Sequence, residues 1–101
     1  MTAFAARLAG VVSARGPLCV GIDPHASILA EWGLSDEASG VRELGLRVVD
    51  AAAGRIGIVK PQIAFFERHG AAGYAALEEV IAAAREAGLL VIADVKRGDV
   101  G

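Results

Sequence analysis

The chain has 101 residues, of which 54% are hydrophobic and 22% are charged, and its formal net charge is −2. This composition excludes a disordered chain, and the net negative charge argues against a nucleic-acid partner, which requires a basic face. The mean hydropathy of +0.50 is high for so short a chain, because small domains bury proportionally little of their surface. We therefore expect residues 1–101 to be a single partial domain of a larger fold.

The first segment, residues 1–15, contains no acidic residue but carries Arg7 and Arg15. Its apolar residues fall at the spacing of an amphipathic helix, for which Thr2 is the expected N-cap. Because Arg7 interrupts the apolar core that a signal peptide requires, this helix is the favoured interpretation, with a transit peptide as the alternative. No apolar run approaches the roughly 18 residues that cross a bilayer, so we expect no membrane partner.

Three short apolar runs follow, at residues 18–22, 56–59 and 89–93. Continuous apolar runs of this length are typical of strands that are buried on both faces of a parallel sheet. Cys19 is the single cysteine and lies inside the first run, so we expect a buried, inert thiol. A lone cysteine also excludes an internal disulfide and indicates a reducing, cytoplasmic compartment.

Helical patterns separate these apolar runs. Ser35 or Ser39 is expected to cap the first helix, and Gly54 stands where a left-handed residue ends a helix. The second helical pattern ends in the same way at Gly88. The apolar stripes consist of Val41, Leu44, Val48 and Val49 in the first helix and of Tyr74, Leu77, Val80, Ile81 and Ala84 in the second.

The alternation of strands and helices predicts an α/β fold with a parallel sheet. The apolar runs recur at intervals close to the roughly 31 residues per unit of a (β/α)8 barrel of about 250 residues. A doubly wound open sheet has similar spacing, so the periodicity leaves both architectures open.

Each apolar run is followed by a charged residue: Asp23, Lys60, and Asp94 with Lys96. The carboxyl ends of parallel strands are where α/β enzymes bind ligands, so these residues are candidates for an active site. On a strand Asp94 and Lys96 would point the same way, and the glycine before Asp99 permits a turn back toward them. A solvated salt-bridge cluster is the alternative interpretation.

The chemistry of such a cluster can be derived from its charges. A lysine between two carboxylates is held as an ammonium, because neighbouring opposite charges stabilise the charged form. Lys96 therefore suits a proton donor to a developing carbanion. A Schiff-base nucleophile would require a neutral lysine, which this setting disfavours.

Residues 94–99, in the pattern D-x-K-x-x-D, resemble the signature of the orotidine 5'-phosphate decarboxylase family. Residues 18–24 (LCVGIDP) resemble the family's first strand. Residues 58–62 (IVKPQ), followed by residues 65–67 (FFE), resemble the second strand of its longer bacterial branch. The three segments occur in the family's order and spacing along nearly the whole chain.

The resemblance implies a (β/α)8 TIM barrel, of which this chain supplies the N-terminal helix and the first three strands. It implies decarboxylation of orotidine 5'-monophosphate to UMP and CO2 in de novo pyrimidine biosynthesis. It also implies a homodimer with shared active sites, a small-molecule substrate and no metal or organic cofactor.

The resemblance further implies a role for each candidate residue. Lys96 would protonate C6 of the pyrimidine as CO2 leaves, and Asp94 would lie beside the departing carboxylate. Asp99 would reach into the neighbouring subunit's site and contact the ribose there. Asp23 and Lys60 would bind ribose hydroxyls and orient the charged network.

Two alternatives to this function remain open. Magnesium-dependent sugar-phosphate decarboxylases and aldolases of the same superfamily share D-x-K-x-x-D, but their second strand ends in a carboxylate that helps to bind the metal. Here that position is Lys60, whose positive charge would repel a metal ion. The other alternative is an inactive fragment, and residues 1–101 in isolation are expected to have no activity.

The remaining aromatic and histidine residues are expected to be structural. His25 is interpreted as a loop residue and His69 as a turn residue, because no second histidine or cysteine lies at metal-ligand spacing. The larger aromatic side chains are expected to serve packing: Trp32, Phe65 and Phe66.

Overall fold

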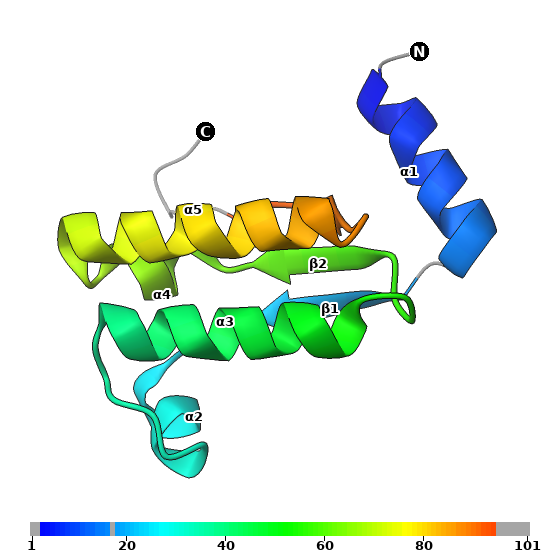
Figure 1. Ribbon diagram of the computed structural model, residues 1–101. Helices are drawn as coiled ribbons and strands as arrows, with labels where there is room; N and C mark the ends of the chain where they lie inside the picture. Colours follow the sequence, from blue (N-terminus) through cyan, green and yellow to red (C-terminus); the bar gives the residue numbers. More distant parts are fainter. Residues whose placement is uncertain (1–2, 17, 95–101) are drawn as a thin grey trace.

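The computed structural model describes residues 3–16 and 18–94 of the chain. Eight elements alternate along it (Figure 1): α1 (Ala3–Arg15), β1 (Cys19–Ile22), α2 (Ala26–Glu31), α3 (Ala38–Ala52), β2 (Ile58–Pro61), α4 (Ile63–Glu67), α5 (Gly70–Glu86) and β3 (Leu90–Val91). The predicted helices and strands are all present. Thr2, the expected N-cap of α1, lies outside the described residues.

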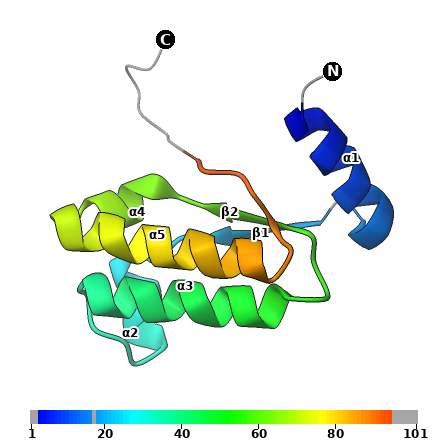
Figure 2. The same cartoon turned by 45° about the horizontal axis from the view of Figure 1, so that its top comes forward.

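The three strands form one parallel sheet in the order β1-β2-β3, which confirms the predicted α/β class. Cys19 pairs with Ile58, and Ile58 in turn pairs with Leu90. Parallel strands need helical crossovers on a face of the sheet. α3 and α5 provide them, and Figures 1 and 2 show the two helices side by side over the same face of the sheet.

The core lies between the sheet and this layer of two helices. The apolar stripes of α3 and α5 meet closely, because Gly45 of α3 has no side chain to separate its backbone from Val80. The buried core residues include Ile22, Val59, Leu89, Val41, Leu44, Val49, Leu77, Val80, Ala84 and Phe66. This packing holds the carboxyl ends of β1 and β2 in a fixed position above the helices.

Two predictions of burial are wrong. Cys19 is exposed, because only the face of β1 that carries Ile22 packs on the helices, and the described residues leave Cys19 and Gly21 on the opposite face uncovered. Tyr74 is 42% exposed. Its hydroxyl donates a hydrogen bond to Glu67 outside the core, at 2.6 Å, while Gly73 and Leu77 of the same helix are buried.

The helix ends agree with the sequence at their C-termini and differ at the start of α3. Gly54 and Gly88 both have positive φ, at 77° and 79°, as predicted. The N-cap of α3 is Glu37, without a side-chain hydrogen bond, and neither Ser35 nor Ser39 caps the helix. The two serine hydroxyls lie 3.4 Å from each other, so they form a hydrogen bond with one another and do not accept one from the helix N–H groups.

Two short helices, α2 and α4, follow β1 and β2 directly and were not anticipated from the sequence. In contrast, α1 was predicted and lies beyond the amino ends of the strands, apart from the layer of α3 and α5 (Figure 1). Among residues 3–16 and 18–94, no helix has the length and apolar character needed to cross a bilayer.

Candidate active site

The carboxyl ends of all three strands meet at one edge of the sheet. Gly21 of β1 pairs with Lys60 of β2, and an isolated parallel bridge joins Gln62 to Asp94 beyond β3. Residues paired across adjacent parallel strands point to the same face, and residues two apart along a strand do as well. Lys60, Gln62 and Asp94 therefore lie on the face of the sheet opposite to α3 and α5.

Backbone hydrogen bonds fix Asp94 in this position. Its N–H donates to the carbonyl of Pro61 at 3.0 Å, and its carbonyl accepts from the N–H of Ile63, also at 3.0 Å. These bonds extend the pairing of β2 and β3 past the last regular strand residue. They therefore fix the backbone from which the Asp94 side chain extends, next to β2.

The side chains of Lys60 and Asp94 form an ion pair across the two strands. The Lys60 Nζ atom lies 3.7 Å from Oδ2 of Asp94, and their side chains are 43% and 16% exposed. A largely buried carboxylate beside an ammonium is an arrangement that can bind a polar ligand and hold a second charged group in place.

Asp23 follows β1 at the same edge and is exposed. A Cβ atom placed on Gly21 would lie 3.3 Å from Oδ2 of Asp23, so the Asp23 carboxylate folds back over the glycine on the Lys60 face. Among residues 3–16 and 18–94 the Asp23 side chain forms no hydrogen bond or ion pair. Its acceptor oxygens are available to a ligand such as a sugar hydroxyl.

Lys96 and Asp99, the two remaining candidates, lie outside the described residues. The described part of the site therefore consists of Asp23, Lys60 and Asp94, with Gln62 between the last two. Sequence reasoning gave Gln62 no role. Its position two residues after Lys60 was the available signal, because strand alternation places both side chains on one face.

Both histidines are structural, as predicted, although each does more than fill a loop or turn. His25 is the N-cap of α2, where its side chain accepts a hydrogen bond from the N–H of Ile28. His69 is the N-cap residue of α5, and its Nε2 lies 3.7 Å from the Asp36 carboxylate. Of the predicted packing residues, Phe66 is fully buried, whereas Trp32 is 41% exposed.

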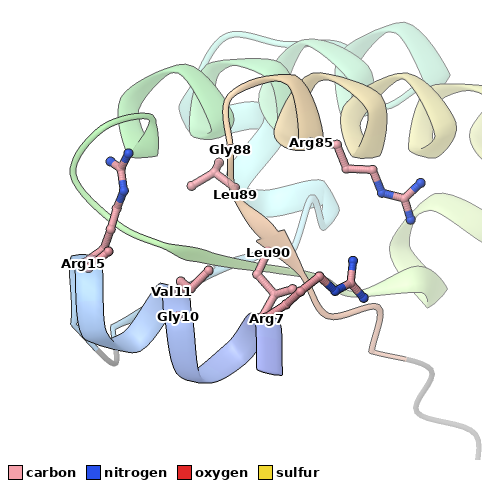
Figure 3. Close-up of a pocket in the computed structure, with 9 residues that line it drawn as sticks. Arg7, Gly10, Val11, Arg15, Arg85, Gly88, Leu89 and Leu90 are labelled. Carbon is pink, nitrogen blue, oxygen red and sulfur yellow. The ribbon is translucent and has the colours of Figure 1, made fainter. Parts of the chain in front are cut away.

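A separate hollow of about 500 Å³ lies at the opposite end of the sheet, between α1 and the junction of α5 with β3 (Figure 3). Arg7, Arg15 and Arg85 stand at its rim, and Val11 and Leu90 are among its apolar lining residues. It contains no carboxylate and none of the candidate residues.

Parallel strands, crossover helices and a lysine–carboxylate pair at the carboxyl edge define the chain as part of an α/β enzyme fold. The sequence model of the family described as "Orotidine 5'-phosphate decarboxylase / HUMPS family" matches residues 16–101. The chain belongs to this family, and its fold is the N-terminal part of a (β/α)8 barrel.

Individual relatives agree with this assignment. The chain is 55% identical over all 101 residues to proteins named orotidine 5'-phosphate decarboxylase from a Nocardioides species and from Streptomyces coelicolor. It spans 37% and 36% of their respective lengths.

Solved structures give the same result. A Streptomyces avermitilis structure described as a candidate orotidine 5'-phosphate decarboxylase superposes with a TM-score of 0.89 at 53% identity, over 100% of this chain and 35% of that one. The Leishmania donovani OMP decarboxylase gives a TM-score of 0.76 at 36% identity, over 99% of this chain and 36% of that one.

Proposed function

We propose that a complete barrel carrying residues 1–101 decarboxylates orotidine 5'-monophosphate to UMP and CO2, a step of de novo pyrimidine biosynthesis. The observation that carries the proposal is the Lys60–Asp94 ion pair at 3.7 Å. It occupies the carboxyl edge of the sheet, in a chain 55% identical to relatives named for this reaction. The substrate is a small anionic nucleotide, and the proposed compartment is the cytoplasm.

The reaction assigns a distinct task to each residue after β3. The bond between C6 and the carboxylate carbon breaks, CO2 leaves, and the electron pair remains at C6. The Lys96 ammonium then donates a proton to C6, which gives UMP and a neutral amine that solvent reprotonates. Asp94 lies beside the departing carboxylate, and its negative charge helps to keep Lys96 protonated before the reaction.

The other residues bind and orient the substrate. Asp23 and Lys60 would bind ribose hydroxyls, because both present charged hydrogen-bonding groups at the same edge of the sheet. Asp99 would contact the ribose in a neighbouring subunit's site, so the proposed active form is a homodimer with shared active sites.

A magnesium-dependent reaction on a sugar phosphate is the second candidate, since the family description also includes HUMPS proteins. Lys60 argues against it. The ammonium lies 3.7 Å from Asp94, so it already neutralises one carboxylate that a cation would need and would repel the cation itself. We therefore propose a reaction that uses neither a metal nor an organic cofactor.

A chimeric barrel tests the proposed function directly. In this chimera, residues 1–101 replace the matched segment of the Streptomyces coelicolor relative, with which they share 55% identity. We expect the chimera to convert orotidine 5'-monophosphate to UMP, measured by the change in pyrimidine absorbance. Lys96→Ala should lower kcat by more than about a hundredfold while the variant still binds UMP, because a proton donor acts mainly in the transition state.

The outcome that contradicts the proposal is a folded chimera without activity, or a Lys96→Ala variant within about tenfold of the parent chimera. In this proposal, residues 1–101 are a single partial domain of the complete barrel. They span about a third of the relatives' lengths, and residues 3–16 and 18–94 form a sheet of three strands. We expect this isolated polypeptide to self-associate and to show no turnover, because the face of β1 that carries Cys19 is uncovered.

A further inference from the structure

We propose that His25 is a positioning residue, which fixes the turn that carries Asp23 against the segment that follows Lys60. The inference rests on the proposed function, because Asp23 and Lys60 are the residues whose relative position it controls. His25 would not touch the substrate itself. Its effect would reach the site through the backbone of the turn after β1.

The Asp23 side chain has no partner of its own among the described residues, so its position depends on the backbone. The Asp23 carbonyl accepts a hydrogen bond from the His25 N–H at 2.7 Å, which closes a tight turn around Pro24. Pro24 is among the fully buried side chains. One residue earlier, the Ile22 carbonyl accepts from the Gln62 N–H at 3.0 Å. The turn is thus held at both ends, and His25 forms its outer end.

The imidazole of His25 anchors that outer end to α2. Its Nδ1 atom lies 3.3 Å from the backbone N of Ile28 and 3.0 Å from the hydroxyl of Ser27. A backbone N–H can only donate, so Nδ1 must be the acceptor and the ring hydrogen belongs on Nε2. The ring therefore acts as the N-cap of α2, and its orientation is set by the start of the helix.

The same ring contacts α4, which belongs to the segment after β2. The ring centroids of His25 and Phe65 are 5.8 Å apart, and their planes meet at 63°, an edge-to-face contact. The Phe65 N–H lies 3.2 Å from the Gln62 carbonyl, to which it donates a hydrogen bond. This bond holds the backbone of Phe65 next to the strand end that carries Lys60.

One imidazole thus joins the two segments that carry the proposed ribose-binding groups. Without it, the turn of Asp23 would still follow β1, but the ring contact between that turn and α4 would be lost. Displacement of a binding group by about 1 Å can reduce activity by up to about a hundredfold. We expect the loss to appear mainly in KM, because Asp23 is proposed to bind ribose rather than to transfer a proton.

The experiment compares three substitutions of His25 in the chimera. His25→Ala removes both contacts and should raise KM for orotidine 5'-monophosphate about tenfold, with a smaller change in kcat. His25→Asn keeps a capping acceptor and His25→Phe keeps an aromatic ring, so each should recover part of the loss. Leu34→Ala is the control, because Leu34 packs against the core beyond α2 and touches neither contact. It should lower the Tm and leave KM unchanged.

The results separate this inference from the proposed function. An active chimera whose His25→Ala variant keeps KM within about twofold contradicts the positioning role, even if its Tm falls. A chimera that is inactive with native His25 contradicts the proposed function instead. In that case, Tm measurements still test whether the two rings stabilise each other, through a comparison of His25→Ala, Phe65→Ala and the double variant. We expect the double variant to lose less than the sum of the single losses, and additive losses would overturn the inference.

Discussion

The Lys60 ammonium lies 3.7 Å from the Asp94 carboxylate, and the two side chains come from segments that are adjacent in the sheet. The lysine is 43% exposed and the aspartate only 16%, so the carboxylate is the more deeply placed partner. An ammonium beside a carboxylate of such low exposure offsets part of the cost of removing that carboxylate from water. Lys60 therefore is the more exposed partner of the pair and stabilises the negative charge of Asp94.

Lys60→Gln tests this double role in the chimera. The substitution keeps a polar, though shorter, side chain but removes the charge beside Asp94, so we expect kcat/KM to fall by about a hundredfold or more. Arg42→Gln is the matched control, because Arg42 pairs with Glu79 on the exposed surface of the helix layer. It removes one positive charge at a distance from the site and should change kcat/KM by less than about twofold. Equal effects of the two substitutions would contradict the role of Lys60.

Mixed subunits test the proposed sharing of the active site. If Asp99 completes the partner's site, an Asp99→Ala chimera mixed with a Lys96→Ala chimera should regain activity. In the mixed dimer one site carries both defects and the other carries neither. After random exchange of equal amounts, about half of the dimers are mixed, and each mixed dimer has one intact site. Up to about a quarter of all sites should therefore be active. A tagged pull-down assay shows whether the subunits exchange. If they exchange and the mixture stays inactive, Asp99 belongs to its own subunit's site.

The order of the elements was predictable because the relevant signals are local. Apolar runs marked the strands, and Gly54 and Gly88 end their helices with the expected positive φ. Exposure of Cys19 was not predictable, because it depends on which face of β1 is covered by distant elements. Tyr74 fitted the periodic stripe of α5, but its hydroxyl binds Glu67 outside the core.

The candidate site was predicted in part for the same reason. The positions of Lys60 and Asp94 follow from where apolar runs end, and the parallel bridge of Gln62 with Asp94 brings the two side chains close together. The contact of His25 with Phe65 joins two short helices that have no strong sequence pattern. Such a contact depends on the tertiary arrangement, and no spacing along the chain indicates it.

The close packing of α3 on α5 gives a prediction about stability. A Cβ atom on Gly45 would lie 2.6 Å from Cγ2 of Val80, which is buried in the core. We expect Gly45→Ala to lower the free energy of unfolding of the chimera by about 1–3 kcal/mol, because added volume forces packed side chains apart. Adding Val80→Ala should make the effect of Gly45→Ala smaller than in the parent, since it removes the clashing methyl groups.

Gly10 provides the control for this prediction. It lies in α1, and a Cβ atom there would meet nothing within 4 Å. Gly10→Ala should therefore stabilise the chimera by up to about 1 kcal/mol, the difference in helix propensity. Urea denaturation measures both values. A Gly45→Ala variant as stable as the parent would show that α3 and α5 can separate without cost.

The loop before α3 carries the one carboxyl group for which a pH effect can be derived from the described residues. A side-chain hydrogen bond from Arg68 is the main cause that lowers the pKa of Asp36 below its ordinary value of 3.8. The charges of Arg68 and His69 add to it, and His69 Nε2 lies 3.7 Å from the carboxylate. Because the folded state holds this proton less tightly than the unfolded state, ionised Asp36 stabilises the fold. That contribution is complete above pH 3.8 and is lost as the pH falls through the lowered pKa.

Asp36→Asn removes the ionised group and should lower the Tm of the chimera near neutral pH. The difference from the parent should shrink as the pH falls below 3.8, because the parent's own carboxyl then becomes protonated and loses the same interaction. Added salt should also reduce the difference, since Asp36 is exposed and its ion pair is screened.

Asp50→Asn is the control for this prediction. Asp50 is an exposed carboxylate of α3 that forms no ion pair within residues 3–16 and 18–94. Its substitution should leave the Tm nearly unchanged. A Tm difference for Asp36→Asn that stays constant from neutral pH to about pH 3 would show that the variant acts through loop packing and that the charge of Asp36 has no part in it.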